Sequence, residues 1–218
     1  MKLTLAPTSP YARFALASAV AADLAQDLEI AWINPYDKSA KFTGLSPAAK
    51  VPVLETSEGR VIAESTLIGV FLAQISGRSE LIGANAAAMA DVFNRIGQAK
   101  SAVDGIYAWA VEKRFGTGER TENLGRGVDT STRIMQSFEA IEAARVSTAR
   151  DLGDIAFAAA FDYASLRLPE IDPEALRAQS VAAAWWARVG EMDAIKLTAI
   201  DRLERLREAN ASNFFADV

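Results

Sequence analysis

The seven prolines of this chain are distributed unevenly along its 218 residues. Five lie at or before Pro52, and none occurs between Val53 and Leu168. Because proline ends or kinks a helix and removes a backbone donor, the front of the chain must turn often, whereas the proline-free middle can form long helices. The distribution predicts a turn-rich first domain followed by a helical one.

The first part of the chain alternates between strand and helix patterns. Short apolar or alternating runs bounded by Pro, Asn-Pro and Ser-Glu-Gly predict four strands, and helical spacing behind Ser9 and from Ser65 predicts two helices. A shorter helical or irregular piece is expected at residues 38–45. The predicted strands cover residues 2–6, 28–32, 53–56 and 60–63. The order strand, helix, strand, helix, strand, strand, helix predicts a small mixed sheet with helices packed on it.

The second part shows helical periodicity only, which predicts a helical bundle. The expected helices cover residues 86–114, 121–150, 152–167, 174–189 and 193–209. The predicted domains are therefore residues 1–77 and 85–218, joined by a linker at 78–84.

Composition excludes several classes of function. The chain has no cysteine and no histidine, which rules out disulfide frameworks, Cys/His metal sites, thiol nucleophiles and catalytic pairs that need imidazole. We expect no metal. A net charge of −5 argues against a nucleic-acid partner.

No run approaches the roughly 20 apolar residues of a membrane span, so no membrane association is expected. The apolar run 14–22 is the one candidate for a signal peptide, but Pro7 and Pro10 interrupt its leader and favour a capped helix. We expect a cytoplasmic protein.

Four local motifs carry a family resemblance. Residues 8–13 read Thr-Ser-Pro-Tyr-Ala-Arg directly after the first strand, and residues 46–55 read Ser-Pro-Ala-Ala-Lys-Val-Pro-Val-Leu-Glu. Glu-Ser follows at 64–65, and residues 151–156 read Asp-Leu-Gly-Asp-Ile-Ala. Together with the order of elements, these motifs make the chain resemble the cytosolic glutathione S-transferases, in particular bacterial members with a serine-type active site.

The resemblance implies a thioredoxin-like βαβαββα domain that binds glutathione, followed by an all-helical domain that carries an electrophile pocket. It implies a cytoplasmic homodimeric detoxification enzyme that adds glutathione to a small hydrophobic electrophile. The alternatives are a non-catalytic carrier or interaction protein of the same fold, and a glutathione-dependent peroxidase.

Within this resemblance, Val51 and Pro52 are expected to bind the backbone of glutathione through a cis peptide bond. For an X–Pro bond the cis form costs only about 0.5–1 kcal/mol. It would turn the N–H and C=O of Val51 outward, where an extended peptide can pair with them. Lys50 offers a cation to a terminal carboxylate. The alternatives are a strand-edge proline without a ligand and a solvated lysine.

Glu64 and Ser65 are expected to hold the γ-glutamyl end. Backbone N–H groups and the Ser65 hydroxyl would meet its carboxylate at a helix N-terminus, and Glu64 would accept from its ammonium. The alternative is simple helix capping.

Ser9 is the predicted catalytic residue. Thioredoxin-like redox proteins read Cys-Pro-Tyr-Cys where this chain reads Ser-Pro-Tyr-Ala at 9–12. Because both sulfurs are absent, the nucleophile must be the thiol of bound glutathione, to which Ser9 would donate a hydrogen bond. Thr8 can take this donor role instead, and Ser9 can serve as a helix cap only. Tyr11 and Tyr107 are expected to line the electrophile pocket, with core packing as the alternative for Tyr107.

Asp151 and Asp154 predict a capping box at the start of the helix at 152–167, with a short acid in the place of the usual Glu.

Overall fold

The computed structural model describes residues 1–37 and 39–215. Its internal contacts divide the chain into two compact units: Met1–Leu81 together with Met192–Val218, and Ile82–Glu191. The C-terminal segment, which the sequence analysis assigns to the helical domain, thus makes its contacts with the first unit.

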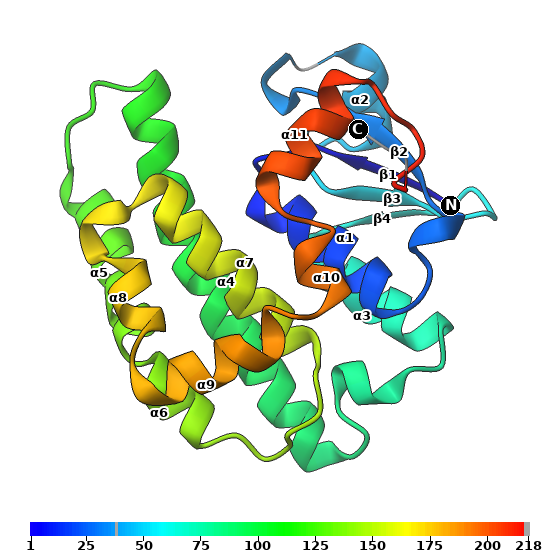
Figure 1. Cartoon of the computed structure of the whole chain (residues 1–218). Helices are drawn as coiled ribbons and strands as arrows, with labels where there is room; N and C mark the ends of the chain where they lie inside the picture. Colours follow the sequence, from blue (N-terminus) through cyan, green and yellow to red (C-terminus); the bar gives the residue numbers. More distant parts are fainter. Residues whose placement is uncertain (38, 216–218) are drawn as a thin grey trace. The chain divides into compact units, whose positions relative to one another are not determined.

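The first unit is built on a four-stranded mixed sheet in the order β2-β1-β3-β4 (Figure 1). β1 pairs with β2 in parallel and with β3 antiparallel, and β3 pairs antiparallel with β4. This is the predicted thioredoxin-like arrangement. Its elements are β1 (Lys2–Leu5), α1 (Pro10–Ala21), η1 (Ala25–Asp27), β2 (Glu29–Trp32), η2 (Pro35–Asp37), α2 (Ala40–Leu45), β3 (Val53–Glu55), β4 (Val61–Ala63), α3 (Ser65–Ile75), η3 (Ser79–Ile82), α10 (Asp193–Lys196) and α11 (Ile200–Glu208).

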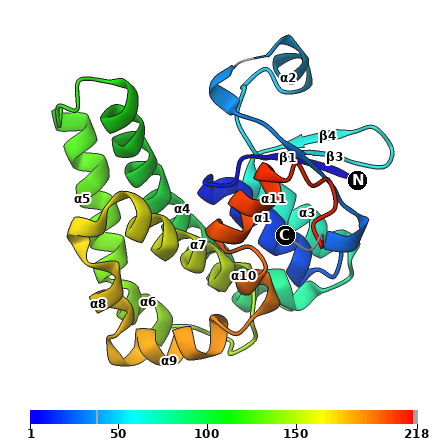
Figure 2. The same ribbon diagram turned by 45° about the horizontal axis from the view of Figure 1, so that its top comes forward.

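Helices α1 and α3 pack against each other on one face of this sheet (Figure 2). The close approach depends on Gly69 of α3, where an added Cβ would lie 2.8 Å from the Phe14 ring and 3.0 Å from Ser18 Oγ. The Ser18 hydroxyl donates to Phe14 O and so stays satisfied inside the interface. The core beneath consists of fully buried side chains from the strands and both helices: Leu3, Leu5, Leu16, Val53, Leu54, Ile68 and Leu72.

The apolar side chains of α3 are only partly buried. Ile68 and Leu72 are fully buried, but Leu67 is 59 % exposed and Ile75 is 48 % exposed. The apolar residues of α3 therefore lie on two sides of the helix: Ile68 and Leu72 are buried, whereas Leu67 and Ile75 face outward.

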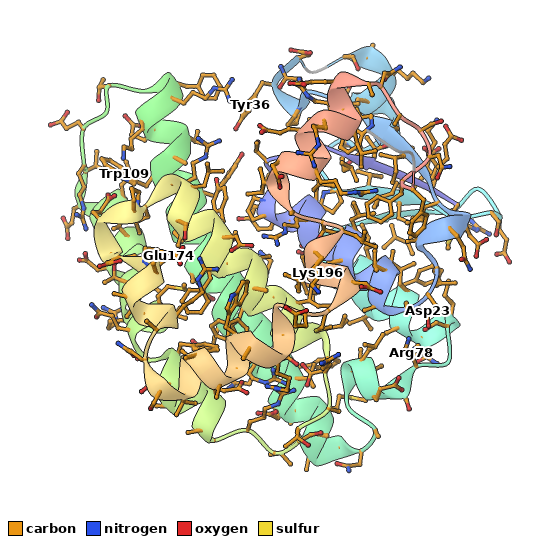
Figure 3. All side chains as sticks on the ribbon, viewed as in Figure 1. Asp23, Tyr36, Arg78, Trp109, Glu174 and Lys196 are labelled. Carbon is orange, nitrogen blue, oxygen red and sulfur yellow. The ribbon has the colours of Figure 1, made fainter. Side chains whose placement is uncertain are left out.

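Exposed ion pairs join the chain after α1 to the chain after α3 in the first unit. The Arg78 guanidinium lies 2.5 Å from Asp23 and 2.9 Å from Glu80, and Figure 3 shows the Arg78 and Asp23 side chains next to each other. The hydrogen bond to Glu80 raises the pKa of Arg78.

The second unit is all helical, as predicted. Its elements are α4 (Ala86–Phe115), α5 (Glu122–Gln136), α6 (Phe138–Ala143), α7 (Leu152–Arg167), η4 (Pro169–Ile171), α8 (Pro173–Arg177) and α9 (Ser180–Val189). The helix expected at 121–150 is divided at Ser137 and ends at Ala143, so the expectation is wrong for residues 144–150, which are not helical. The helices expected at 174–189 and 193–209 are each divided in two, with breaks at Gln179 and Ala199.

The predicted capping box at the start of α7 is confirmed. Asp151 Oδ1 accepts from the backbone N–H of Gly153 and Asp154, and Asp154 Oδ2 accepts from the backbone N–H of Asp151 at 3.1 Å. Both carboxylates also bind buried guanidinium groups, those of Arg95 and Arg145. The cap of α7 is therefore part of the ionic core of the helical unit.

None of the described helices is both long enough and apolar enough to cross a membrane.

Candidate active site

The strand register brings the predicted site segments to one end of the sheet. Val53 pairs with Thr4 on one side and with Ala63 on the other. Neighbouring strands lie about 4.8 Å apart, so the chain after β1, the chain before β3 and the chain after β4 leave the sheet side by side. Ser9, Pro52 and Glu64 belong to these three segments.

Ser9 caps the N-terminus of α1. Its Oγ accepts from the backbone N–H of Ala12 at 3.2 Å, and Pro10 occupies the first helical position, where a missing N–H costs nothing. Capping uses a lone pair of the hydroxyl oxygen and leaves its proton free to be donated. Ser9 and Thr8 directly precede α1, so the two candidate donors lie at the same helix end. Both are half-exposed.

Val51 and Pro52 precede β3, and the bond between them is cis, as the resemblance implies. Within residues 1–37 and 39–215, the backbone N–H and C=O of Val51 make no backbone hydrogen bond. Val51 is half-exposed and Lys50 beside it is exposed. This stretch is therefore an open backbone edge with a cation next to it.

Glu64, rather than Ser65, is the N-cap of α3. Its Oε2 accepts from the backbone N–H of Thr66 at 3.0 Å and of Leu67 at 3.4 Å, and its Oε1 accepts from the Ser65 hydroxyl at 3.2 Å. The capping contacts that the sequence analysis kept as an alternative are thus present. The N-terminus of α3 holds a carboxylate on two N–H groups and one hydroxyl.

The backbone of Glu64 has φ of +80°, a conformation that side chains other than glycine rarely adopt. Sequence reasoning missed this feature, because a glutamate carries no signal for positive φ. Backbone strain of this kind costs about 1–3 kcal/mol and is concentrated at functional sites. The β4–α3 junction therefore has a backbone conformation that a glutamate adopts only at a steric cost.

The two tyrosines predicted for the electrophile pocket lie on different helices. Tyr11 is in the first turn of α1, beside Ser9, and is half-buried. Tyr107 is in the middle of α4 in the helical unit and is also half-buried. Their role in a pocket stays a prediction.

The described part of the chain has no group of three or more acidic side chains placed to hold a metal ion. Among residues 1–37 and 39–215, the site segments themselves offer hydroxyls, backbone N–H groups, one carboxylate and one ammonium.

Comparison with known proteins gives one family model and several solved structures. Residues 8–75 match the family model for the glutathione S-transferase N-terminal domain. A glutathione transferase family member from Pseudomonas fluorescens Pf-5, solved with bound glutathione, has a TM-score of 0.80 at 21 % identity, over 90 % of this chain and 97 % of its own. This chain has the glutathione transferase fold.

Two further solved structures with this fold are similar over nearly their whole length. A glutathione S-transferase from Methylobacillus flagellatus with glutathione bound has a TM-score of 0.80 at 23 % identity, over 91 % of this chain and 98 % of its own. One from Methylobacterium radiotolerans, in complex with glutathione sulfonate, has a TM-score of 0.79 at 20 % identity, over 100 % and 96 %. The comparison with curated protein sequences gives no match.

The match to the N-terminal domain model covers the predicted glutathione site. It begins at Thr8 and extends beyond Ser65, so all residues assigned to the site in the first unit lie within it.

Proposed function

We propose that this protein is a glutathione transferase with a serine-type active site, which binds glutathione in its first unit, stabilises the thiolate and adds it to a small hydrophobic electrophile. The observation that carries the proposal is the register of β3, which places the Ser9, Val51 and Glu64 segments at one end of the sheet. Each segment offers a group that matches a different part of the tripeptide.

The N-terminus of α3 is suited to the γ-glutamyl end. It already holds one carboxylate, that of Glu64, on backbone N–H groups and on the Ser65 hydroxyl. A substrate carboxylate can take these donors, because helix N-termini attract anions in general. Glu64, once displaced, becomes an acceptor for the substrate ammonium. The Glu64 carboxylate then caps α3 when the substrate is absent and accepts from the substrate ammonium when it is bound.

The N–H and C=O of Val51, which make no backbone hydrogen bond within the described residues, suit the middle of the peptide. An extended peptide adds to such an edge as a short strand, with one donor and one acceptor satisfied. Lys50, exposed next to it, can meet the glycyl carboxylate.

Ser9 is the proposed donor to the sulfur. A free thiol with pKa about 8.5 is only about 3 % thiolate at neutral pH, and lowering that pKa by two units takes about 2.7 kcal/mol. A hydroxyl that donates to an anion contributes about 1.5–3 kcal/mol, and a helix N-terminus adds up to about 1 kcal/mol. The hydrogen bond from the Ser9 hydroxyl, together with the N-terminus of α1, can therefore supply the free energy needed to lower the pKa of the thiol by two units. Ser9 acts as a donor and not as a base or nucleophile.

Tyr11, half-buried in the first turn of α1, is the proposed contribution of the first unit to the electrophile pocket. Tyr107, half-buried on α4 of the helical unit, is proposed on its own as an aromatic contact for the electrophile. Both present an aromatic ring with a polar tip, which fits a small apolar electrophile that carries a polarisable leaving group.

The decisive experiment compares Ser9→Ala with Thr8→Ala. Loss of the Ser9 donor should lower kcat/KM for conjugation about tenfold to a hundredfold, the equivalent of one hydrogen bond to an anion. Glutathione affinity, measured by calorimetry, should stay within about threefold of wild type, while the pKa of the bound thiol rises. Thr8→Ala is the matched control and should change neither quantity. The reverse pattern would assign the donor role to Thr8.

The same assays distinguish the alternatives. A wild-type protein that binds glutathione but turns over none of a broad panel of electrophiles is a carrier of this fold. Consumption of organic hydroperoxides at the expense of glutathione would identify a peroxidase. A protein that gives no binding heat with millimolar glutathione contradicts the proposal as a whole.

We further propose that the chain forms a homodimer. Outward-facing apolar side chains on β4 and α3 support this: Val61 is 46 % exposed, Leu67 59 % and Ile75 48 %. Leu67 and Ile75 are eight residues apart on α3, about two helical turns, so they lie on the same side of that helix. Exposed apolar surface of this kind can serve association when it is contiguous. Sedimentation at the monomer mass in micromolar solution would contradict the dimer, and Leu67→Glu should shift a dimer towards the monomer.

A further inference from the structure

Strand β2 is an edge of the sheet in the first unit, since its only neighbouring strand among the described residues is β1. The N–H of Glu29 donates to Met1 O and the N–H of Ile33 donates to Leu5 O, so these residues face β1. Backbone direction alternates along a strand, and the N–H of Ile30 therefore points away from the sheet. An unprotected edge of this kind is a template for pairing with a strand from another chain.

The C-terminal segment occupies this edge. The N–H of Ile30 donates to Ser212 O at 2.8 Å, and Glu29 and Asn213 form an antiparallel bridge. The indole N–H of Trp32 donates to Ala211 O at 2.7 Å. Both ends of β2 are thus bound to a stretch of chain about 180 residues away, which follows α11 in Figure 1.

A local turn directs the chain onto the strand. Helix α11 ends at Glu208, and Asn210 adopts φ of +49°, the left-handed conformation that asparagine tolerates better than most residues. The N–H of Asn210 donates to Arg207 O, and the N–H of Ala211 donates to Leu206 O. These two bonds are the Schellman pattern of a helix C-terminus, which here sends the next residues along β2.

Two side chains anchor the segment beyond the turn. Phe214 is 1 % exposed, whereas its neighbour Phe215 is 46 % exposed. Arg202 of α11 donates to the backbone oxygens of Leu197 and Phe214, at 2.9 and 2.7 Å, and its guanidinium lies 4.7 Å from the centre of the Phe214 ring. The segment is therefore bound by backbone pairing, by a buried aromatic ring and by a cation.

We propose that residues 210–214 are a built-in cover of the β2 edge, an interaction surface whose partner is this chain's own C-terminal segment. By occupying the outward N–H of Ile30, the segment excludes a strand from a second copy of the chain. Attachment through α11 gives it a high effective concentration, so that no separate chain competes at ordinary protein concentrations. The cover is independent of glutathione binding and of catalysis.

Amide exchange in the full chain tests the proposal. In Phe214→Ala the anchor is lost, and the exchange rate of the Ile30 amide should rise at least tenfold, while the amide of Leu54 in the sheet centre stays protected. Phe215→Ala is the matched control, because it removes the neighbouring exposed ring, and it should leave Ile30 unchanged. Equal exchange at Ile30 in Phe214→Ala and wild type would overturn the proposal, as would equal effects of the two variants.

A milder variant keeps the test valid if Phe214→Ala does not fold. Trp32→Phe keeps an aromatic ring but removes the pyrrole part of the indole, including the N–H that binds Ala211 O, so Ile30 exchange should still rise severalfold. An unchanged Ile30 amide in this variant would count against the cover.

Sedimentation tests the exclusion of a second copy. Phe214→Ala should form concentration-dependent species heavier than the wild-type assembly, and Phe215→Ala should not. If the Ile30 amide exchanges faster in Phe214→Ala but no heavier species forms, the segment does not block association through β2.

Discussion

Arg95 and Asp151 are joined by a buried ion pair in the helical unit, with Nη2 of Arg95 2.5 Å from Oδ2 of Asp151 and both side chains 1 % exposed. Asp154 is buried beside them and accepts from Arg145 at 2.8 Å and from the Trp185 indole N–H at 2.9 Å. The start of α7 is thereby bound to α4, to the chain after α6 and to α9. A helix cap that would ordinarily serve one helix organises four segments of the unit.

Asp154→Ala should destabilise the protein by about 3–5 kcal/mol, because it leaves buried guanidinium groups without one of their partners. This exceeds the roughly 1 kcal/mol expected for loss of a helix cap alone. Urea unfolding of the variant measures the difference. Asp129→Ala is the control, since it breaks only the exposed pair with Arg120 and should cost less than about 1 kcal/mol. Similar losses in both variants would contradict the structural role of Asp154.

The buried carboxyl of Glu142 should make stability depend on pH. Burial raises its pKa above the ordinary value, and the nearby Asp154 acts in the same direction, against the attraction of Arg145 and Arg188. The folded state therefore holds the proton at pH values where the unfolded state has lost it. The stabilising contribution of this carboxyl is complete below its unfolded pKa and is lost as pH rises through the folded pKa.

Glu142→Gln removes this dependence. The unfolding free energy of the variant relative to wild type should increase as pH rises from about 4 towards neutrality, the range that begins near an ordinary glutamate pKa. Urea titrations at a series of pH values measure the slope, with Glu122→Gln at the exposed start of α5 as the control for the substitution itself. A difference that stays constant, or that falls with rising pH, would contradict the prediction.

Two glycines of α4 should respond in opposite ways to alanine. At Gly105 an added Cβ would lie 2.2 Å from Gly127 O of α5 and 2.3 Å from Ser131 Oγ, whereas at Gly97 nothing lies within 4 Å. Gly105→Ala should destabilise by about 1–3 kcal/mol through overpacking. Gly97→Ala should stabilise by about 0.5–1 kcal/mol, because it removes backbone freedom from an exposed helix position. Thermal melts of the two variants measure the effect. A melting temperature above that of wild type in both variants would refute the close α4–α5 contact.

The strained backbone at Glu64 should be revealed by comparing glycine with alanine. Both substitutions remove the carboxylate that caps Thr66 and Leu67, but only glycine adopts φ of +80° without a steric penalty. Glu64→Gly should therefore be more stable than Glu64→Ala by about 1 kcal/mol in urea unfolding. Both should bind glutathione more weakly than wild type under the proposed function. An alanine variant at least as stable as the glycine variant would show that the backbone there is not strained.

Local signals predicted the starts of several elements correctly. Ser9 followed by Pro10 begins α1, and the pair of Asp151 and Asp154 begins α7 with the expected reciprocal hydrogen bonds. These are interactions between residues two to four positions apart, so the sequence contains nearly all the information they need. The sequence also places Ser9 after β1, Pro52 directly before β3 and Glu64 after β4, whereas the roles of these residues in binding and catalysis stay predictions.

The breaks within the predicted helices had no such local signal. The chain at Gln179 and at Ala199 is extended, although neither position has proline or glycine nearby to require it. At the start of α9 the missing cap is supplied from a distance, since Glu139 of α6 accepts from the backbone N–H of Val181 and Ala182. A partner about 40 residues away cannot be inferred from periodicity.

The sequence alone determined the order of strands and helices, the absence of any protein thiol or imidazole, and the caps that begin α1 and α7. These features depend on residue type and on near neighbours, where the free energy of a turn or a cap is decided locally. The tertiary structure decided that Glu64 caps α3 with a strained backbone, that Arg95 and Arg145 bind the α7 cap, and that the C-terminal segment covers β2. Those outcomes depend on which buried charges and backbone groups come together when the chain folds. A buried polar group without a partner costs so much free energy that the fold must supply one, and that partner can be distant in the sequence.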